Sequence, residues 1–265
     1  MTNLGRESAL LEMNCVSHTY DSKRGINTAL EGIDLQIEPR EIVALVGPSG
    51  CGKTTLINLF AGFLEPTAGE VFVEGKKAHH MRGRVGLIQQ TDSLFPWLTI
   101  AENVRYPLRL KRVADTPAVP TVVESLLQVG LEAYSKSWVR ELSGGMRKRA
   151  ELARVIAQNA EVWLLDEPFV GLDVQAREEM QLLLLRLWAI QHRTILITGH
   201  DLEEAAYLSN RVILLSRSPG RLAVEYAIPF EYPRAPDLKL RPEFIAIRSR
   251  MTNDLRAVAR TRDDI

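Results

Sequence analysis

The segment from Gly47 to Thr54, GPSGCGKT, has the residue types and the spacing needed to hold phosphate groups. It matches the pattern G-x-x-x-x-G-K-[ST] at every specified position. Glycines let backbone amides turn toward phosphate oxygens, Lys53 adds a mobile positive charge, and Thr54 offers a hydroxyl to Mg²⁺. A chance glycine-rich turn is the alternative, which the flanking apolar run and helical pattern oppose. The segment predicts that a nucleoside triphosphate is bound by Gly47, Pro48, Ser49, Gly50, Cys51, Gly52, Lys53, Thr54 and Thr55.

A second candidate for chemistry is the acidic pair Asp166-Glu167, which follows the apolar run Val162–Leu165. In an open α/β sheet, the carboxyl end of a buried strand faces the ligand crevice. There Asp166 would hold Mg²⁺ and Glu167 would polarise an attacking water, as phosphoryl transfer requires. The alternative is a polar strand exit without a catalytic role, and the phosphate-binding segment upstream argues against it.

Strands and helices alternate along the chain and would position these groups. Apolar runs predict buried strands at 41–46, 85–88, 162–165, 194–198 and 211–216. Helical spacing predicts helices at 54–63 and 176–190. This alternation is typical of an α/β fold with a mainly parallel sheet covered on both faces. The segments 11–20 and 30–37 alternate apolar and polar residues, and they predict an N-terminal antiparallel β part.

We expect one domain, residues 1–265, built from three parts. The core spans about 10–91 and 162–228, an inserted helical subdomain spans about 92–161, and a helical tail spans about 229–265. Prolines interrupt the tail, and the apolar residues that follow recur at helical spacing: Phe244, Ile247, Met251, Leu255 and Val258. The tail is too short for a separate regulatory domain, so we expect it to be structural.

The composition excludes several classes of protein. The 265 residues are 46% hydrophobic and carry a formal net charge of +0, which favours neither a nucleic-acid partner nor disorder. No apolar run is long enough to span a bilayer, and 1–12 lacks a signal-peptide pattern, so we expect a cytosolic chain. Cys15 and Cys51 are too few for a disulfide framework; Cys51 could react, but a small filler residue is expected.

The segment Leu142–Met146, LSGGM, resembles the LSGGQ signature of ABC ATPases. The motifs also follow one another in that family's order. These motifs are the phosphate-binding segment, Gln90, the signature, Asp166-Glu167, Gly171-Leu-Asp173 and His200. The resemblance covers about 11–216 and implies a P-loop NTPase core that hydrolyses ATP with Mg²⁺.

The resemblance implies roles for further residues. Tyr20 would stack on adenine, Gln90 would reach Mg²⁺ and the attacking water, and His200 would contact the γ-phosphate. Two alternatives stay open: Tyr20 could pack in the core, and Gln89 could take the role of Gln90. The expected catalytic residues are Glu167, His200 and Gln90, and the expected metal ligands are Thr54, Gln90 and Asp166.

Ser143, Gly144 and Gly145 form a second candidate anion site, because a serine hydroxyl and free amides lie at the start of a helix. In the family this segment closes on the ATP of the opposite subunit. The resemblance therefore implies a head-to-tail dimer with a second copy or a paralogue, and Asp173 would lie at its interface. A plain helix cap is the alternative for the serine.

The chain departs from the family pattern at four positions. Met146 replaces the usual glutamine, Gly171 an alanine, Gly199 a threonine, and Gln89 a frequent aromatic residue. None of these changes removes a catalytic group, so they leave the rate in question and not the reaction.

The segment Ser93–Val104, LSGGMR and the Pro-Glu-Phe of the tail resemble importer ATPases for nitrate, sulfonate and taurine. That resemblance implies polytopic permease subunits, an indirect solute-binding protein, and a peripheral position at the cytoplasmic face of the membrane. Phe95, Trp97 and Leu98 would line a groove for a permease helix, or else belong to the core of the helical subdomain.

Two other functions compete with transport. A nucleic-acid-handling ABC ATPase usually needs coiled-coil insertions or basic patches, and the neutral charge and short chain oppose it. A small-molecule kinase would use the phosphate-binding segment, but it would leave the LSGGM segment and His200 unexplained.

Overall fold

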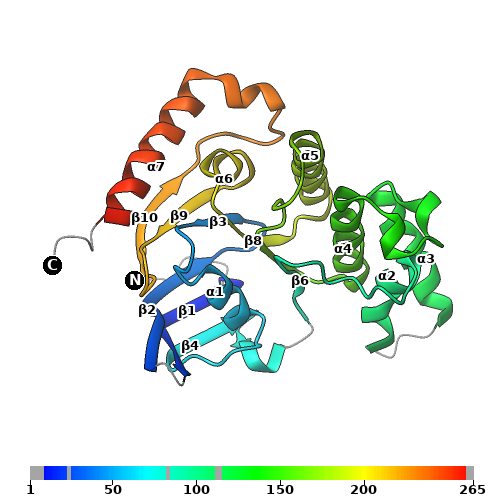
Figure 1. Ribbon diagram of the computed structural model, residues 1–265, viewed down its shortest axis with the longest axis horizontal. Helices are drawn as coiled ribbons and strands as arrows, with labels where there is room; N and C mark the ends of the chain where they lie inside the picture. The colour runs from blue at the N-terminus through cyan, green and yellow to red at the C-terminus, as the bar shows by residue number, and fades with distance from the viewer. Residues whose placement is uncertain (1–8, 23–24, 82–83, 111–114, 261–265) are drawn as a thin grey trace, which may run out of the picture.

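Strands distant in the sequence assemble into a central sheet, which the computed structural model places at the middle of the molecule (Figure 1). The structure describes residues 9–22, 25–81, 84–110 and 115–260. Within them the sheet strands are β3 (Ile42–Val46), β6 (Gly86–Ile88), β7 (Val162–Asp166), β8 (Thr194–Gly199), β9 (Arg211–Leu215) and β10 (Leu222–Ala227). Their order is β10-β9-β3-β8-β7-β6. All neighbours pair in parallel except β10, which runs antiparallel to β9, so the predicted mainly parallel sheet is confirmed.

The central strand β3 shows why the sheet appears in the sequence as continuous apolar runs. All five of its residues are buried. Ile42, Ala44 and Val46 join the apolar cluster on one face, and Val43 and Leu45 join the cluster on the other. A parallel sheet with both faces covered has no polar side, and a strand within it therefore lacks alternation.

A second sheet of four antiparallel strands carries the N-terminal part of the chain. It has the order β2-β1-β4-β5 and consists of β1 (Leu11–Ser22), β2 (Gly25–Ile37), β4 (Ala68–Val73) and β5 (Lys76–Lys77). Helix α1 (Lys53–Phe60) contributes to the same apolar cluster as these strands, and the short η1 (Ala78–Met81) follows β5. In β2 the buried positions alternate with exposed ones from Ile33 to Ile37, as expected for a half-buried strand.

The helical part lies beyond β6, at the opposite end of the molecule from β10 (Figure 1). It contains α2 (Ile100–Leu110), α3 (Asp115–Gln128), η2 (Glu132–Tyr134), η3 (Val139–Glu141) and α4 (Gly144–Gln158). The three α-helices contact one another, and α4 also packs on β6. Helix α4 therefore joins the helical part to the sheet edge nearest the acidic pair.

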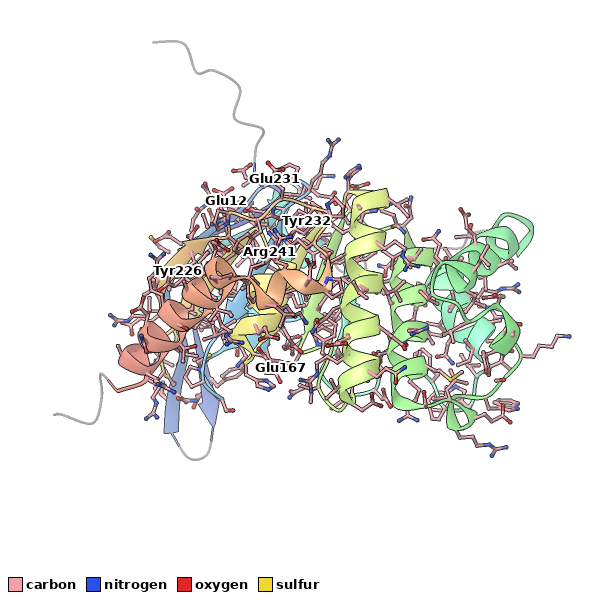
Figure 2. The ribbon with its side chains drawn as sticks, turned by 90° about the horizontal axis from the view of Figure 1, so that it is seen from above. Glu12, Glu167, Tyr226, Glu231, Tyr232 and Arg241 are labelled. Carbon is pink, nitrogen blue, oxygen red and sulfur yellow. The ribbon has the colours of Figure 1, made fainter. Side chains whose placement is uncertain are left out.

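The tail packs back on the sheet through α6 (Leu202–Leu208). The remaining helices are α5 (Val174–Gln191), η4 (Pro236–Leu240) and α7 (Pro242–Arg260). Arg234 is only 4% exposed and donates hydrogen bonds to the carbonyl oxygens of Ala206, Tyr207 and Ser209 at the end of α6. Tyr226 of β10 donates a hydrogen bond to Asp254 of α7, and Figure 2 shows this side of the molecule from above. These contacts make the tail part of the same packed body.

Among the elements that the sequence patterns miss are β10 and α6. Only one residue of β10, Tyr226, is buried, and α6 has seven residues, which is too short for helical periodicity to be distinguished. No helix among the described residues is long and apolar enough to cross a bilayer.

Candidate nucleotide-binding and hydrolysis site

The phosphate-binding segment forms the connection between β3 and α1. Gly50 and Gly52 have φ of 78° and 97°, a region in which other residues are strained. Gly52 precedes the first turn of α1, and no side chain caps the amides there. A Cβ at Gly50 would meet no atom within 4 Å, so the space over the loop is open. Uncapped amides at a helix N-terminus beside open space suit an anionic ligand.

Lys53 points back over this loop. Its side chain is 7% exposed, and its Nζ donates to the carbonyl oxygen of Gly47 at 2.9 Å and to that of Pro48 at 3.4 Å. The same Nζ lies 3.5 Å from Oε1 of Glu167. The ammonium group is thus held between the loop and the acidic pair, where its charge faces any phosphate in the cleft.

Asp166, at the end of β7, accepts hydrogen bonds from two hydroxyls. Thr54 donates to its Oδ2 at 2.8 Å, and Thr198 donates to its Oδ1 at 2.6 Å. The second contact follows from the parallel register, which places Asp166 opposite Thr198 of β8. Sequence reasoning missed Thr198, although a polar residue near the end of an apolar strand beside β7 was a usable signal. The hydroxyl of Thr54 and the carboxylate of Asp166 form the hard oxygen pair that Mg²⁺ prefers.

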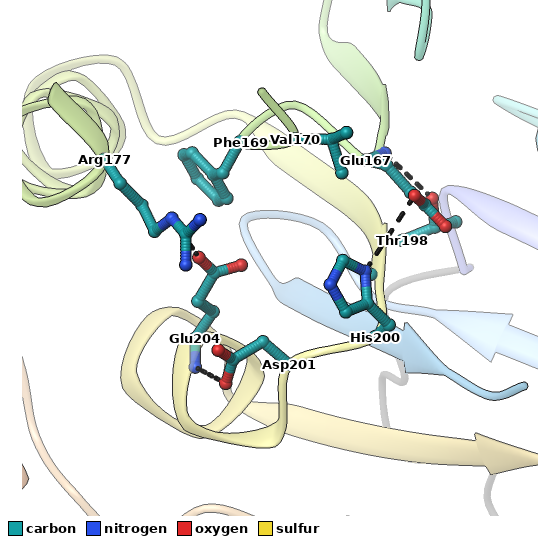
Figure 3. A pocket seen from close by; sticks show the side chains of 9 residues that line it. Glu167, Phe169, Val170, Arg177, Thr198, His200, Asp201 and Glu204 are labelled. Atoms are coloured by element: carbon teal, nitrogen blue, oxygen red, sulfur yellow. Dashed lines mark hydrogen bonds and ion pairs between the residues drawn. The ribbon is translucent and has the colours of Figure 1, made fainter. Parts of the chain in front are cut away.

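Glu167 is the meeting point of the predicted catalytic residues. Gln90 donates from Nε2 to its Oε2 at 3.2 Å. Nδ1 of His200 lies 3.9 Å from the same oxygen, as Figure 3 shows. Glu167 has a φ of 47°, which is costly for a residue with a side chain, and its amide donates to Oγ1 of Thr198 at 3.1 Å. Strain of this kind is concentrated at functional sites, and here it directs the carboxylate toward Lys53 and Gln90.

Gln90, and not Gln89, is the residue that reaches Glu167. Gln89 instead uses its backbone carbonyl, which accepts a hydrogen bond from Lys148 of α4 at 3.2 Å. Lys148 also pairs with Glu151 at 3.0 Å, and both side chains are buried. Because α4 begins at the LSGGM segment, this buried pair connects that segment to the loop carrying Gln90. The sequence patterns do not single out Lys148 or Glu151.

Tyr20 stands at the rim of the cleft above α1. Its hydroxyl lies 3.1 Å from Oγ1 of Thr55, and its ring packs edge-on against His18 with centroids 4.6 Å apart. The side chain is 39% exposed, so the interpretation of Tyr20 as a core residue is wrong. The cleft encloses about 350 Å³ and is lined by Tyr20, Asn27, Ala29, Ser49, Gly50, Cys51, Gly52, Lys53, Thr54, Thr55, Gln90 and Glu167.

Eight predicted residues do not line this cleft. Four of them contact a lining residue: Gly47, Pro48, Asp166 and His200. The other four lie at the starts of α4 and α5: Ser143, Gly144, Gly145 and Asp173. Ser143 caps α4 by accepting from the amide of Met146, and Asp173 caps α5 by accepting from the amide of Ala176. A Cβ added at Gly145 would lie 3.3 Å from the Cβ of Ala176, so the two capped helix starts lie side by side. One copy of the chain therefore presents them as a surface separate from its own phosphate-binding loop.

Comparison with known protein families matches residues 30–170 to the ABC transporter family. The chain belongs to this family. The taurine import ATP-binding protein TauB of Escherichia coli (strain K12) is 38% identical over 240 residues, which cover 88% of this chain and 93% of that protein. TauB of Jannaschia sp. (strain CCS1) is 37% identical over 243 residues, covering 90% and 91%.

Solved structures of ABC cassettes share the fold. The ATP-binding cassette MJ0796, in a dimeric post-hydrolysis state bound to ADP and Pi, has a TM-score of 0.74 at 29% identity, covering 83% of this chain and all of that one. The cbiO1 protein of Clostridium perfringens, part of the ABC transporter complex cbiONQ, has a TM-score of 0.75 at 25% identity, covering 93% and 100%. The predicted P-loop NTPase fold is confirmed, and this ABC protein is an ATP-binding ATPase.

Gly220, in the turn between β9 and β10, packs directly against the phosphate-binding loop of this ABC ATPase. Its amide donates to the carbonyl of Ala29 at 2.9 Å, and its carbonyl accepts from the amide of Glu31 at 3.0 Å, so it cannot move freely. A Cβ here would lie 2.0 Å from the carbonyl oxygen of Cys51. The Cys51 thiol is buried, which raises its pKa, and this accords with the expected filler role.

We expect Gly220→Ala to weaken ATP binding and to lower the free energy of unfolding by about 1–3 kcal/mol, because the new methyl group pushes on the loop backbone. Titration with a fluorescent ATP analogue and urea denaturation measure the two effects. Arg221→Ala is the matched control, since the Arg221 side chain is exposed and pairs with the exposed Glu31, and the substitution keeps its backbone hydrogen bonds with Ser216. Wild-type ATP affinity in Gly220→Ala would contradict the role of this contact.

Proposed function

We propose that the chain is the ATP-hydrolysing subunit of an importer, which couples ATP hydrolysis to uptake of taurine or a similar small anion such as nitrate or another sulfonate. The observation that carries this proposal is the convergence of Lys53, Gln90 and His200 on Glu167. The similarity to taurine import proteins supports the direction of transport and the class of substrate. In this proposal the chain is one domain, with a core at about 10–91 and 162–228, a helical subdomain at 92–161 and a tail from 229.

ATP would lie in the cleft between Tyr20 and Glu167. The exposed ring of Tyr20 offers a face for adenine, and the loop from Gly47 to Thr55 offers amides for the phosphates. Lys53 would exchange its hydrogen bonds to loop carbonyls for phosphate oxygens, which supply a full negative charge.

The donor set fits Mg²⁺. The Thr54 hydroxyl and the Asp166 carboxylate are 2.8 Å apart, and Gln90 supplies an amide oxygen from the facing loop. When bound, Mg²⁺ would neutralise charge that develops on the phosphate oxygens. Thr198 orients Asp166 for this role through its hydrogen bond to Oδ1.

Glu167 would orient the attacking water and draw its proton, and His200 would contact the γ-phosphate. Both side chains lie at the ends of adjacent strands, and the carboxylate of Glu167 is already aligned by Lys53 and Gln90. Catalysis of this kind depends mainly on positioning and on fixed charges. The site would be completed by Ser143, Gly144 and Gly145 of a second copy or a paralogue, with Asp173 at the interface.

Phe95, Trp97 and Leu98 would receive a helix of the permease subunits. Trp97 is 68% exposed, and its ring packs on Phe95, which in turn packs on Tyr106 of α2. This exposed aromatic residue follows the Gln90 loop, so a helix docked there would adjoin the hydrolysis site. Docking of this kind would hold the chain at the cytoplasmic face of the membrane, and a solute-binding protein would act through the permease.

We expect Trp97→Asp to abolish assembly with the permease and solute uptake, because it places a charge in an apolar contact, while the ATP affinity of the isolated chain is unchanged. Co-purification with the tagged permease and uptake of labelled taurine, sulfonates and nitrate measure the effect. Leu240→Asp is the matched control, because Leu240 is 79% exposed in the tail. Assembly and uptake at wild-type levels in Trp97→Asp would rule out the docking role.

The function itself is tested by deleting the gene in its own organism. Loss of uptake of these anions, restored by the wild-type gene but not by a Lys53→Ala variant, is expected. Unchanged uptake of all of them, with a DNA-repair defect or with ATP-dependent phosphorylation of a small molecule instead, would favour one of the competing functions.

A further inference from the structure

A partly buried group of charged and polar side chains connects the two helices that follow the Asp173 and His200 loops. Helix α5 begins directly after Asp173, and helix α6 is capped by Asp201, the residue after His200. Glu204 of α6 and Arg177 of α5 face each other on one side of the pocket, and His200 and Glu167 lie on its other side (Figure 3). Neither Arg177 nor Glu204 belongs to the nucleotide site described above.

Arg177 contacts both helix starts. Its Nη2 donates to the carbonyl oxygen of Leu172 at 3.4 Å, and its Nε lies 3.4 Å from Oε1 of Glu204. This Nε is buried and makes no hydrogen bond of good geometry, so the carboxylate of Glu204 is its compensating charge. Leu172 immediately precedes Asp173, and the Arg177 side chain therefore connects the Asp173 loop to α6.

Glu204 is held from three elements. Its side chain is 16% exposed, and Gln181 of α5 donates to Oε1 at 3.3 Å. Nζ of Lys239 in η4 donates to Oε1 of Gln181 at 2.9 Å, which brings a second positive charge close to Glu204. Asp201, on its own helix, accepts from the amides of Glu203 and Glu204. Movement of the Glu204 carboxylate would therefore disturb the first turn of α6 and the His200 loop before it.

We propose that Glu204 is a positioning residue for hydrolysis: through Arg177 it fixes α6, and with it His200, relative to the Asp173 loop and to Glu167. The inference deepens the proposed function and rests on it. His200 needs such support, because its side chain is 70% exposed and its one described polar contact is the 3.9 Å approach to Glu167. A small displacement of a group near the γ-phosphate can cost a large factor in rate.

The charge on Glu204 depends on pH near neutrality. Burial, followed by the negative charge of Asp201, raises its pKa to about 7, although Arg177, Lys239 and Gln181 act in the opposite direction. Between the ordinary value of 4.5 and about 7, the folded chain holds a proton that the unfolded chain releases, so this group's contribution to stability falls as pH rises through that range. Above about 7 the carboxylate is charged and pairs fully with Arg177. Positioning should therefore improve as pH rises through 7.

The test compares Glu204→Gln and Arg177→Met in the full chain, assayed with its permease in membranes or at chain concentrations where the wild type hydrolyses ATP. Glutamine keeps the size and the contact with Gln181 but removes the charge that faces Arg177. We expect kcat to fall by at least about tenfold with KM for ATP unchanged. The rise of wild-type kcat through pH 7 should be lost, and the double variant should be no slower than either single variant.

Glu203→Gln is the control, because Glu203 is adjacent but pairs with Arg248 of α7. The inference is overturned if Glu204→Gln shows the kcat and pH profile of Glu203→Gln, or if ATP affinity and thermal stability fall in proportion to kcat. If the wild-type chain itself hydrolyses no ATP in this assay, the proposed function is overturned instead. The two failures are therefore distinguishable.

Discussion

Replacing Glu167 by glutamine is expected to slow ATP hydrolysis by about 10²- to 10⁴-fold while ATP binding is retained, because this range is typical for loss of a general base. Glutamine has the same shape, so the hydrogen bond with Gln90 and the strained backbone at Glu167 can persist. The glutamine side chain, however, cannot accept a proton from the attacking water. Loss of the negative charge 3.5 Å from Lys53 also leaves that ammonium free for phosphate, so affinity should not fall.

The measurement is single-turnover hydrolysis alongside equilibrium ATP binding. Glu161→Gln is a matched control, because Glu161 lies just before β7, at the other end of the strand that leads to Glu167, and pairs with Arg193 in an exposed position. The control should hydrolyse ATP at the wild-type rate. If Glu167→Gln does so as well, Glu167 is not the base and the assignment of the site fails.

The sequence predicts best those features that depend on local pattern. Continuous apolar runs predicted the buried strands of the parallel sheet, because a strand covered on both faces has no polar side. The ends of those strands carry Asp166 and Thr198, and a parallel register alone brings them together. The loop after β3 was predicted by its glycines, which adopt positive φ.

The features that the sequence does not predict depend on contacts between segments that are distant along the chain. Arg234 lies in the tail that prolines interrupt, and no local pattern indicates that it is buried and caps the end of α6. What distinguishes Gln90 from Gln89 as the glutamine of the site is its side-chain contact with Glu167, which is 77 residues away in the sequence. The pairing of Arg177 with Glu204 belongs to the same class, since each residue alone resembles an ordinary surface charge.

The separation of Ser143, Gly144 and Gly145 from the cleft leads to the second large effect. We expect Gly144→Asp to abolish hydrolysis while the same chain still binds ATP. A side chain at Gly144 would meet only the end of Arg147, 4.0 Å away, and an acidic residue in the first turn of α4 suits the helix dipole, so the fold should be kept. The added carboxylate would face the phosphates of the opposite copy, and such like-charge contacts cost several kcal/mol, or at least about a hundredfold in rate.

The decisive measurement is complementation in mixed dimers. A Lys53→Ala chain keeps its own Ser143–Gly145 surface, and a Gly144→Asp chain keeps its own phosphate-binding loop, so a mixed pair contains one intact site. We therefore expect each variant alone to be inactive and the mixture to recover part of the wild-type rate. Leu240→Asp is the control, because it adds the same charge at a residue of the tail that is 79% exposed. If the mixture stays inactive while both chains dimerise, the composite site formed by two copies is wrong; if Gly144→Asp alone hydrolyses ATP normally, the surface takes no part in hydrolysis.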